Sequence, residues 1–512
     1  MFQAAQPVFA NGEGLLMEAD QPCRSAVVDL GSNSVRLVVF EGRSRNPLPI
    51  FNEKAVLRLG RGLTETGKLN EEGVEMAKEV LSRFHAIARA MKADPFEILA
   101  TAAVRDASNG PAFVQTLRES MPGVPIRILS GKEEADHSAI GVMCGIPGAS
   151  GLVADVGGGS LELIHLTPQG RHDATTLPLG MIRLADRSGR DLDKAKNLAD
   201  KDIGGVEWLP KVKGSTLYLV GGAFRALARL QIARTQYPLN IVHYYTMDVQ
   251  EAREMTGWLQ NSSRRSLERL PGAPRKRLDD TPFAAMVLRR LMKKVQPDKI
   301  VFCVDGLREG WYMLKVAPDI LAQNPMDVVA REMCARFGRS NSLPYALMQW
   351  TDFLRPEETA EEKYLRHLAC YLSDIGSHDH PEYRAEQTYW RILRVQSGGF
   401  DHPSRAWLAL ALAIRYAADQ QAPFLVTSRA LLSEQDWKSA VVLGLALRLA
   451  YSLSGGAGRL LEGTSLEWEE DALVLILTSA RVAVKGESVR RGLERLGQAL
   501  GVATRFEIEL VG

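Results

Sequence analysis

Two segments of the chain repeat the same pattern: an apolar strand, an aspartate, a glycine-rich turn and a second apolar strand. The first copy reads AVVDLGSNSVRLVVF at residues 26–40, and the second reads LVADVGGGSLELI at residues 152–164. Asp29 and Asp155 hold the same place in the two copies, 126 positions apart (155 minus 29). Because each hairpin needs its own sheet and its own covering helices, the repeat predicts a duplicated α/β domain.

Strand and helix patterns fill the sequence around the two hairpins. Residues 71–91 carry apolar side chains at helical spacing, and residues 98–100 and 126–129 read as further strands. A strand at 217–220 runs through two glycines into a helix at 223–230, a junction suited to binding phosphate. The first part of the chain is therefore predicted to be α/β throughout.

A chain of 512 residues is too long to fold around a single hydrophobic core, and its length predicts about three or four domains. We place the two halves of the duplication at 23–138 and 139–317, a helix-rich region at 318–465 and a small α/β cap at 466–512. Pro318, Pro325 and Pro344 mark the boundary zone before the helical region. Residues 1–22 are acidic without a basic cluster, unlike a secretory signal, and are expected to be a disordered leader.

The composition limits the compartment in which we expect the protein and the partners that we expect it to bind. The five cysteines are scattered without a CxxC pair, which favours the cytoplasm over an oxidising compartment. No run of about 18 apolar residues is present, so no membrane partner is expected. The net charge is only +2, and the basic runs lack interleaved aromatics, so no nucleic acid is expected either. Any anionic polymer would have to be held by a local patch of cations.

The two turns are candidate phosphate-binding loops, because glycines let backbone N–H groups approach phosphate oxygens without interference from a Cβ. Each turn follows an acidic residue, and magnesium prefers oxygen ligands beside substrate phosphates. Asp29 and Asp155 are therefore candidate Mg²⁺ ligands. The candidate phosphate-binding residues of the loops are Gly31, Ser32, Asn33 and Ser34 in the first copy and Gly157, Gly158, Gly159 and Ser160 in the second.

A third candidate element is the start of a helix at SGKEEA, residues 130–135. Ser130 and Glu133 fit a capping box, which gives Glu133 a structural role. Glu134 has no such role and is the candidate general base, although a surface glutamate is the alternative. Arg105 follows a strand and is placed to contact phosphate or to pair with a neighbouring carboxylate; the spacing leaves both open.

These elements together resemble the exopolyphosphatase and guanosine pentaphosphate phosphatase family. The resemblance rests on six motifs in the same order: VVDLGSNSVRLVV, ATAAVRDASN, LSGKEEA, VADVGGGSLEL, YLVGGAFRALARL and VDGLREG. It implies two actin-like, ribonuclease-H-like domains that enclose a cleft, as in actin, sugar kinases and heat-shock chaperones. It also implies that Glu134 is the catalytic glutamate, that Asp155 and Glu162 lie near the metal and the attacking water, and that Arg105 faces the phosphate chain.

The chain departs from the family pattern at two positions. Leu161 replaces the threonine of GGGSTE, and Ala223 replaces the threonine of GGT, so each site loses a hydroxyl group. The region after 318 resembles an HD-phosphohydrolase-like domain whose metal site is degenerate. Ser373-Asp374 stands where the His-Asp pair belongs, and His378-Asp379 falls in an expected loop. We interpret this region as a module that grips a polymer and forms a homodimer.

The sequence thus predicts a Mg²⁺-dependent exopolyphosphatase that processively removes terminal phosphate from inorganic polyphosphate, with Glu134 as base. Three alternatives stay open. The protein could hydrolyse guanosine pentaphosphate, for which guanosine tetraphosphate or pentaphosphate would be the ligand. It could be a kinase of the same superfamily, or a sensor that binds phosphate or an alarmone without turnover.

Overall fold

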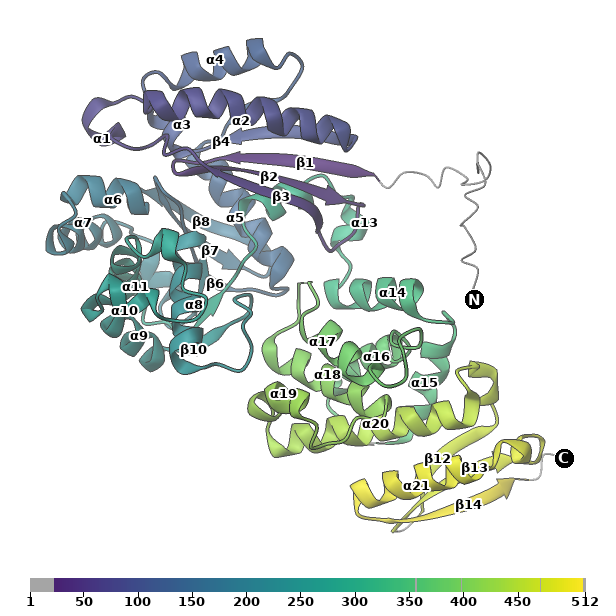
Figure 1. Cartoon of the computed structure of the whole chain (residues 1–512). Coiled ribbons are helices and arrows are strands. Elements are labelled where there is room, and N and C mark those ends of the chain that lie inside the picture. Colours follow the sequence, from purple (N-terminus) through teal and green to yellow (C-terminus); the bar gives the residue numbers. More distant parts are fainter. Residues whose placement is uncertain (1–22, 355–356, 397, 470, 510–512) are drawn as a thin grey trace, which may run out of the picture.

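The computed structural model describes residues 23–354, 357–396, 398–469 and 471–509 (Figure 1). The leader predicted at 1–22 lies outside the described residues. In this part of the chain three sheets form, two of them in the first 320 residues and a smaller one near the C-terminus. Helices cover these sheets and build the region between the second and the third sheet.

The first sheet has the strand order β3-β2-β1-β4-β5. The hairpin strands β1 and β2 pair antiparallel, as do β2 and β3, whereas β4 and β5 run parallel to β1. The strands are β1 (Arg24–Leu30), β2 (Ser34–Glu41), β3 (Leu48–Val56), β4 (Ala93–Ala100) and β5 (Ile126–Ile128).

The second sheet repeats this arrangement, with the order β10-β11-β9-β6-β7-β8. Strands β6, β7 and β8 are antiparallel neighbours, β9 and β11 continue in parallel, and β10 closes the edge. The strands are β6 (Gly151–Val156), β7 (Leu161–Thr167), β8 (Gly170–Leu177), β9 (Thr216–Val220), β10 (Thr246–Asp248) and β11 (Lys299–Phe302). The shared topology confirms the duplication predicted from the two hairpins.

Alternating side chains of β1 divide the first sheet into two faces, as strand geometry requires. Ala26 and Val28 pack under α2 (Glu71–Ala90) and α4 (Gly110–Ser120). Val27 points to the opposite face and packs against Trp311 of α12 (Leu307–Met313). The first sheet is therefore covered on both sides, and one cover comes from a segment about 280 residues later in the chain.

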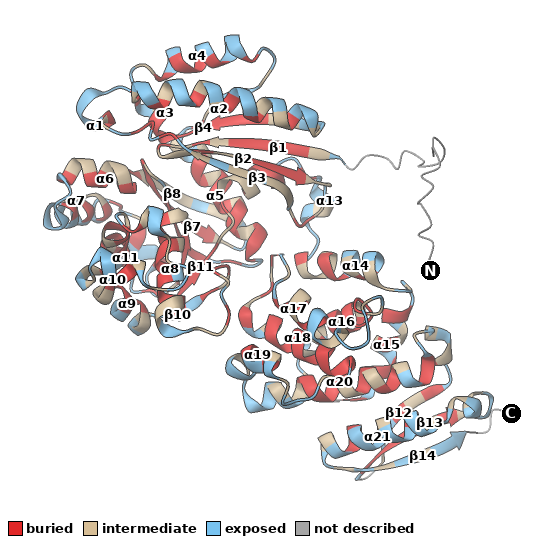
Figure 2. Cartoon of the chain, viewed as in Figure 1, coloured by how far each residue is buried: buried red, intermediate tan, exposed pale blue. Residues whose placement is uncertain are grey.

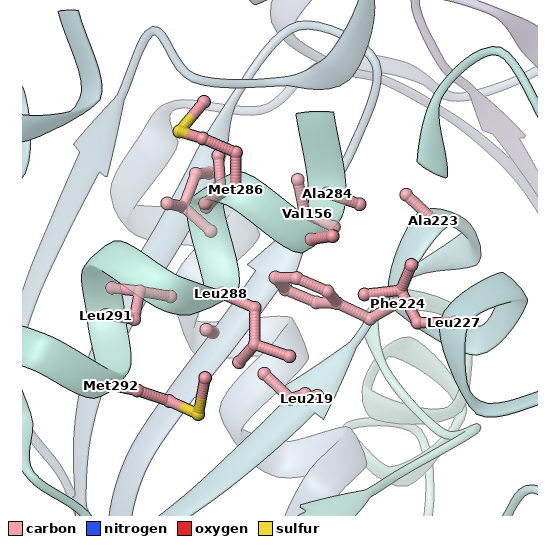
Figure 3. Close-up of a cluster of buried hydrophobic side chains, with 14 of the residues drawn as sticks. Val156, Leu219, Ala223, Phe224, Leu227, Ala284, Met286, Leu288, Leu291 and Met292 are labelled. Carbon is pink, nitrogen blue, oxygen red and sulfur yellow. The ribbon is translucent and has the colours of Figure 1, made fainter. Parts of the chain in front are cut away.

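The second sheet is also covered on both faces. Figure 3 shows Phe224 of α8 (Gly222–Thr235) and Leu288 of α11 (Thr281–Val295) packing with Val156 and Leu219 on one face. On the other face, Ala139 and its neighbours in α5 (Gly131–Gly145) pack on the strands. The remaining helices of this half are α6 (Met181–Ser188), α7 (Leu192–Gly204), α9 (Val249–Asn261) and α10 (Arg264–Glu268), and those of the first half are α1 (Leu63–Thr66) and α3 (Ala102–Asp106).

Helix α5 joins the two halves. It runs without a break through the boundary that we place between residues 138 and 139. Its residues pack on the second sheet, while Cys144 near its end belongs to the cluster beneath the first sheet. In Figure 1, α5 lies between the two sheets. The division into two domains remains our proposal, since α5 and α12 serve both halves.

The helical region and the C-terminal sheet share one hydrophobic core. Leu447 of α20 (Glu434–Ser454), Leu475 of β13 (Ala472–Thr478) and Leu493 of α21 (Glu487–Leu500) belong to the same buried cluster. Figure 2 shows the buried faces of these elements turned toward each other. The other elements are β12 (Thr464–Glu469), β14 (Ala503–Glu509), α13 (Pro318–Leu321), α14 (Pro325–Phe337), α15 (Leu343–Thr351), α16 (Ala360–Leu372), α17 (Arg384–Leu393), α18 (His402–Arg415) and α19 (Val426–Leu431).

Asp374, which stands at the degenerate HD position, is bound by arginine. It is buried next to the end of α16, and its Oδ1 accepts a bond of 2.7 Å from Arg339 Nη2. The backbone N–H of Arg339 donates to the other carboxylate oxygen at 2.9 Å. Ser373 caps the helix, and His378 is exposed in the following turn. None of the helices in the described part of the chain combines the length and apolar character needed to span a membrane.

Candidate active site

A cavity of about 180 Å³ lies between the two halves, where the hairpin turns meet. The predicted residues that line it are Asp29, Gly31, Ser32, Asn33, Ser34, Glu134, Asp155, Gly157, Gly158, Gly159, Ser160 and Glu162. Arg105 is the exception. Its side chain contacts the carboxylate of Glu134 and also donates to the backbone carbonyl of Leu129 at 3.0 Å, so it pairs with a neighbouring carboxylate.

The two turns touch, and their glycines permit this contact. A Cβ on Gly158 would lie 3.1 Å from the Cβ of Ser32, which is closer than side-chain carbons normally approach. A Cβ on Gly159 would lie 2.7 Å from Ser32 Oγ and 3.0 Å from the Cβ of Ala102. The glycines are thus required for close approach between the loops, because neither φ angle lies in the left-handed region.

The loop backbones leave amide groups available to a ligand. The carbonyl of Gly158 accepts bonds from the backbone N–H of Ile182 and Arg183, and the carbonyl of Asn33 accepts from Leu57 and Arg58. Within the described residues, no hydrogen bond is donated by the N–H groups of Ser32, Asn33, Gly158 and Gly159. A loop whose carbonyls are engaged and whose amides are free is suited to binding an anion.

Glu134 is placed by the start of α5. The predicted capping box is confirmed, since the N–H of Glu133 donates to Ser130 Oγ at 3.2 Å and the N–H of Ser130 donates to Glu133 Oε2 at 2.8 Å. Glu134 turns instead toward the cavity and is only 6% exposed. Burial raises the pKa of Glu134 to about 7, against the lowering effect of Arg105. A carboxylate with this pKa can exchange a proton near neutral pH.

Three more carboxylates converge on the cavity from the paired strands. Asp155 and Glu162 are direct partners across β6 and β7, and Asp29 holds the corresponding place in the first sheet. Burial raises the pKa of all three, and the nearby Glu134 carboxylate raises the pKa of Glu162 further. Glu162 Oε1 is buried without a hydrogen-bond partner in the described part of the chain. Such a set of oxygen ligands fits a hard divalent cation.

The carboxylates do not enclose a metal on their own. Among the described residues, no three of them bring ligand atoms within 4.8 Å of one another. A divalent cation bound to them would have to complete its coordination with water or substrate oxygens.

Cationic side chains line the same cavity, and no common spacing in the sequence marks them as a group. They are Arg36 of β2, Lys54 of β3, Arg225 of α8, Arg277 of the 3₁₀ turn Arg275–Arg277, and Arg308 of α12. Burial and neighbouring guanidinium groups lower the pKa of Arg36 to about 10, that of Lys54 to about 8 and that of Arg225 to about 10. Cations this close together favour a multiply charged anion between them.

The two departures from the family pattern lie outside the cavity. Leu161 is fully buried in the core of the second half, and Ala223 is buried in the same core. Neither residue lines the cavity, whereas the neighbouring Ser160 and Gly222 do. A hydroxyl at either position would therefore extend from a side chain packed in the core.

The described geometry has counterparts in known proteins. Residues 38–317, more than half of the chain, match the model of the Ppx/GppA phosphatase family. The chain belongs to the Ppx/GppA phosphatase family. Membership makes the protein an enzyme, a hydrolase of phosphoanhydride bonds. Residues 328–507 match a second model, described as the C-terminal part of exopolyphosphatase.

Two mycobacterial proteins that are similar to this Ppx/GppA family chain are named exopolyphosphatases. Exopolyphosphatase 1 of Mycobacterium tuberculosis is 27% identical over 305 residues, which cover 57% of this chain and 88% of the relative. Exopolyphosphatase 2 of the same species is 24% identical over 294 residues, which cover 53% of this chain and 91% of the relative.

A solved structure confirms the fold. The crystal structure of an exopolyphosphatase from Cytophaga hutchinsonii superimposes with a TM-score of 0.52 and 24% sequence identity, and covers 57% of this chain and 99% of that chain. The first part of this Ppx/GppA family member therefore has the predicted actin-like fold, with two related α/β halves around a cleft.

Proposed function

We propose that this protein is an exopolyphosphatase, which removes terminal phosphate from inorganic polyphosphate. The observation that carries the proposal is the composition of the cavity: contacting loops with free amides, converging carboxylates and a wall of arginine and lysine. The names of the relatives that match the chain point the same way. A chain of phosphates offers repeated anionic groups to such a wall.

In the proposed mechanism, a water oxygen attacks the terminal phosphorus and the bond to the bridging oxygen breaks. Glu134 accepts the proton of the water, and Arg105 holds the Glu134 carboxylate in place. The products are orthophosphate and a polyphosphate shorter by one unit, whose terminal oxygen leaves as an anion. Free amides of the loops and the guanidinium of Arg308 stabilise the negative charge that builds on the transferred group.

Mg²⁺ is the proposed cofactor. Asp29 and Asp155 would hold it, with Glu162 beside them, and it would neutralise phosphate charge when bound. The supporting observation is the buried oxygen of Glu162 that lacks a hydrogen-bond partner within the described residues.

The wall of the cavity favours a polymer over a nucleotide. Among the described residues that line it, no aromatic side chain is present to stack on a guanine base. Guanosine pentaphosphate hydrolysis and non-catalytic binding of an alarmone are the alternatives. The same groups would carry out the first, and the second would leave the carboxylates without a role.

The test compares kcat/KM for long-chain polyphosphate and for guanosine pentaphosphate, using one preparation with Mg²⁺ and measuring released phosphate. We expect polyphosphate to be preferred by at least about tenfold, a difference of about 1.4 kcal/mol in transition-state binding. A preference for guanosine pentaphosphate would favour the nucleotide alternative. Release from neither substrate would identify a sensor, and unchanged release by Glu134→Gln would place the activity elsewhere.

Three further parts of the proposal concern the whole protein. The helical region, in the role of an HD-like domain without a metal centre, would grip the polymer and form a homodimer. The protein would act processively, because a gripped chain stays bound between cleavages. The cytoplasm is its proposed location, since the cysteines of the described residues are all free.

A further inference from the structure

A second group of potential ligands lies beside the active-site cleft, at the end of β11. His243, Cys303 and Asp305 each offer one ligand atom, and these atoms all lie within 4.8 Å of one another. His243 comes from the loop before β10, and the other two residues follow from β11. Cys303 is fully buried and His243 is 6% exposed. This combination of nitrogen, sulfur and oxygen donors is typical of a zinc site.

The hydrogen bonds of His243 leave one ring nitrogen available. Its Nε2 lies 3.1 Å from the carbonyl oxygen of Gly145, which can only accept, so Nε2 carries the proton. Nδ1 is therefore unprotonated, and its contact is a long one, 3.4 Å from the N–H of Val304. Histidines that bind metal commonly donate their other N–H to a backbone carbonyl, which fixes the ring in this way.

Asp305 brings a carboxylate into the same space. Within the described residues its side chain has no ion pair or hydrogen bond. The absence of a side chain on Gly145 makes room for it, since a Cβ there would overlap Asp305 Oδ2 and lie 2.8 Å from His243 Cε1. Asp305 is half-buried, and a carboxylate in such a place without a bonded partner is stabilised when a cation binds to it.

A larger cavity gives access to this group. It has a volume of about 770 Å³ and is lined by His243, Asp305 and Cys144, among others. Water from this cavity can thus reach a metal held by His243, Cys303 and Asp305 and complete its coordination.

We propose that His243, Cys303 and Asp305 bind a Zn²⁺ ion, with water from the larger cavity as the fourth ligand. The thiol of Cys303 loses its proton to solvent when the Zn–S bond forms. Ligand atoms around tetrahedral zinc lie about 3.4–3.6 Å apart, given bond lengths of about 2.0–2.3 Å. Side chains already within 4.8 Å reach this geometry by small rotations, and the Zn–N bond replaces the long contact from Val304.

The site would fix the segment that follows β11. Val304, Gly306 and Arg308 from this segment line the catalytic cavity, and the carbonyl of Val304 accepts a bond of 2.9 Å from Arg225. A bound Zn²⁺ would therefore hold one wall of the cleft. The proposal is independent of the substrate and holds whichever phosphoanhydride the enzyme hydrolyses.

Cobalt binding to the full-length protein tests the site. The parent protein carries Cys23→Ser and His172→Ala, which remove the exposed thiol and the other described ligand group, formed by His165, His172 and Asp173. After treatment with a chelator, Co²⁺ is added and the thiolate-to-cobalt absorption band in the near ultraviolet is recorded. We expect the band to saturate at a single Co²⁺ per chain and to disappear when Zn²⁺ is added.

Cys303→Ser should abolish the band, and the matched buried cysteine variant Cys370→Ser should retain it. Circular dichroism checks that each variant is folded. Asp305→Asn is the second test, because it keeps the shape and should weaken Zn²⁺ binding by at least about tenfold, measured by competition with a zinc dye. Absence of the band in the parent, or an unchanged band in Cys303→Ser, would overturn the proposal.

Discussion

At the scale of single residues, two neighbouring glutamates of α5 have different environments. Glu133 completes the capping box and pairs with Arg127 at 2.8 Å, and its side chain is 42% exposed. Glu134 is buried against Arg105 at the wall of the cavity. Adjacent helical residues point about 100° apart, so one carboxylate stays at the surface while the next enters the cleft.

Replacing Glu134 by glutamine should lower kcat by about 10²- to 10⁴-fold, because the amide cannot accept the proton of the attacking water. Glu133→Gln is the matched control. Glutamine preserves the capping box, so this variant should keep its activity and its melting temperature. Phosphate release under saturating polyphosphate measures both variants.

The dependence of the rate on pH distinguishes two possible effects of Glu134→Gln: the loss of the general base and a displacement of Arg105. In the unmodified enzyme the rate should fall as the pH drops through the pKa of Glu134, about 7, since the protonated carboxyl cannot act as a base. The residual activity of Glu134→Gln should lack this acid limb. If the limb persists unchanged in the variant, another group is the base.

At the scale of elements, the glycines in the turn of the second hairpin differ in how tightly they are packed. A Cβ on Gly157 would meet only Ser160 O, at 3.7 Å, which is an ordinary contact. A Cβ on Gly159 would meet the opposite loop at Ser32 and also Ala102. Gly157 and Gly159 therefore differ in how well they tolerate a larger side chain.

Gly159→Ala should push the loops apart and reduce kcat/KM by about tenfold, the equivalent of one weakened phosphate hydrogen bond. Gly157→Ala should stay close to the unmodified enzyme. Steady-state kinetics on polyphosphate make the comparison, and equal losses in the two variants would show that loop contact does not limit binding.

These elements also show what the sequence could predict. The hairpins, the capping box and Glu134 are local patterns, in which a few consecutive residues determine the geometry. Lys54 and Arg277 could not be found in this way, because they come from distant elements and share no spacing. Arg277 stands in a run of basic residues with no pattern that points to the cavity, and the structure places it there.

At the scale of the whole molecule, the domains that we expect from the sequence share helices and a hydrophobic core. The boundary that we place between residues 465 and 466 falls inside β12. A hydrophobic pattern shows which face of an element is buried but not which partner covers it. The common core of the helical region and the C-terminal sheet could therefore not be predicted from the sequence.

The shared core predicts that damage in the last helix spreads to the helical region. Leu493 of α21 is 1% exposed and packs in the cluster that contains Leu447 and Leu449 of α20. Leu493→Ala should lower the free energy of unfolding by about 2–5 kcal/mol, because it removes buried methyl groups and leaves a cavity. Amide hydrogen exchange should show this loss in α20 as well as in α21, since both unfold with the same core.

The exposed neighbour Arg490 supplies the control, because its ion pairs within the described residues are with Glu487 and Glu494 on the helix surface. Arg490→Ala should leave exchange in α20 unchanged. Strands β1 and β6 belong to other hydrophobic clusters and should keep their protection in both variants. If Leu493→Ala accelerates exchange in α21 and β13 but spares α20, the C-terminal sheet folds as an independent cap and the helical region is stable without it.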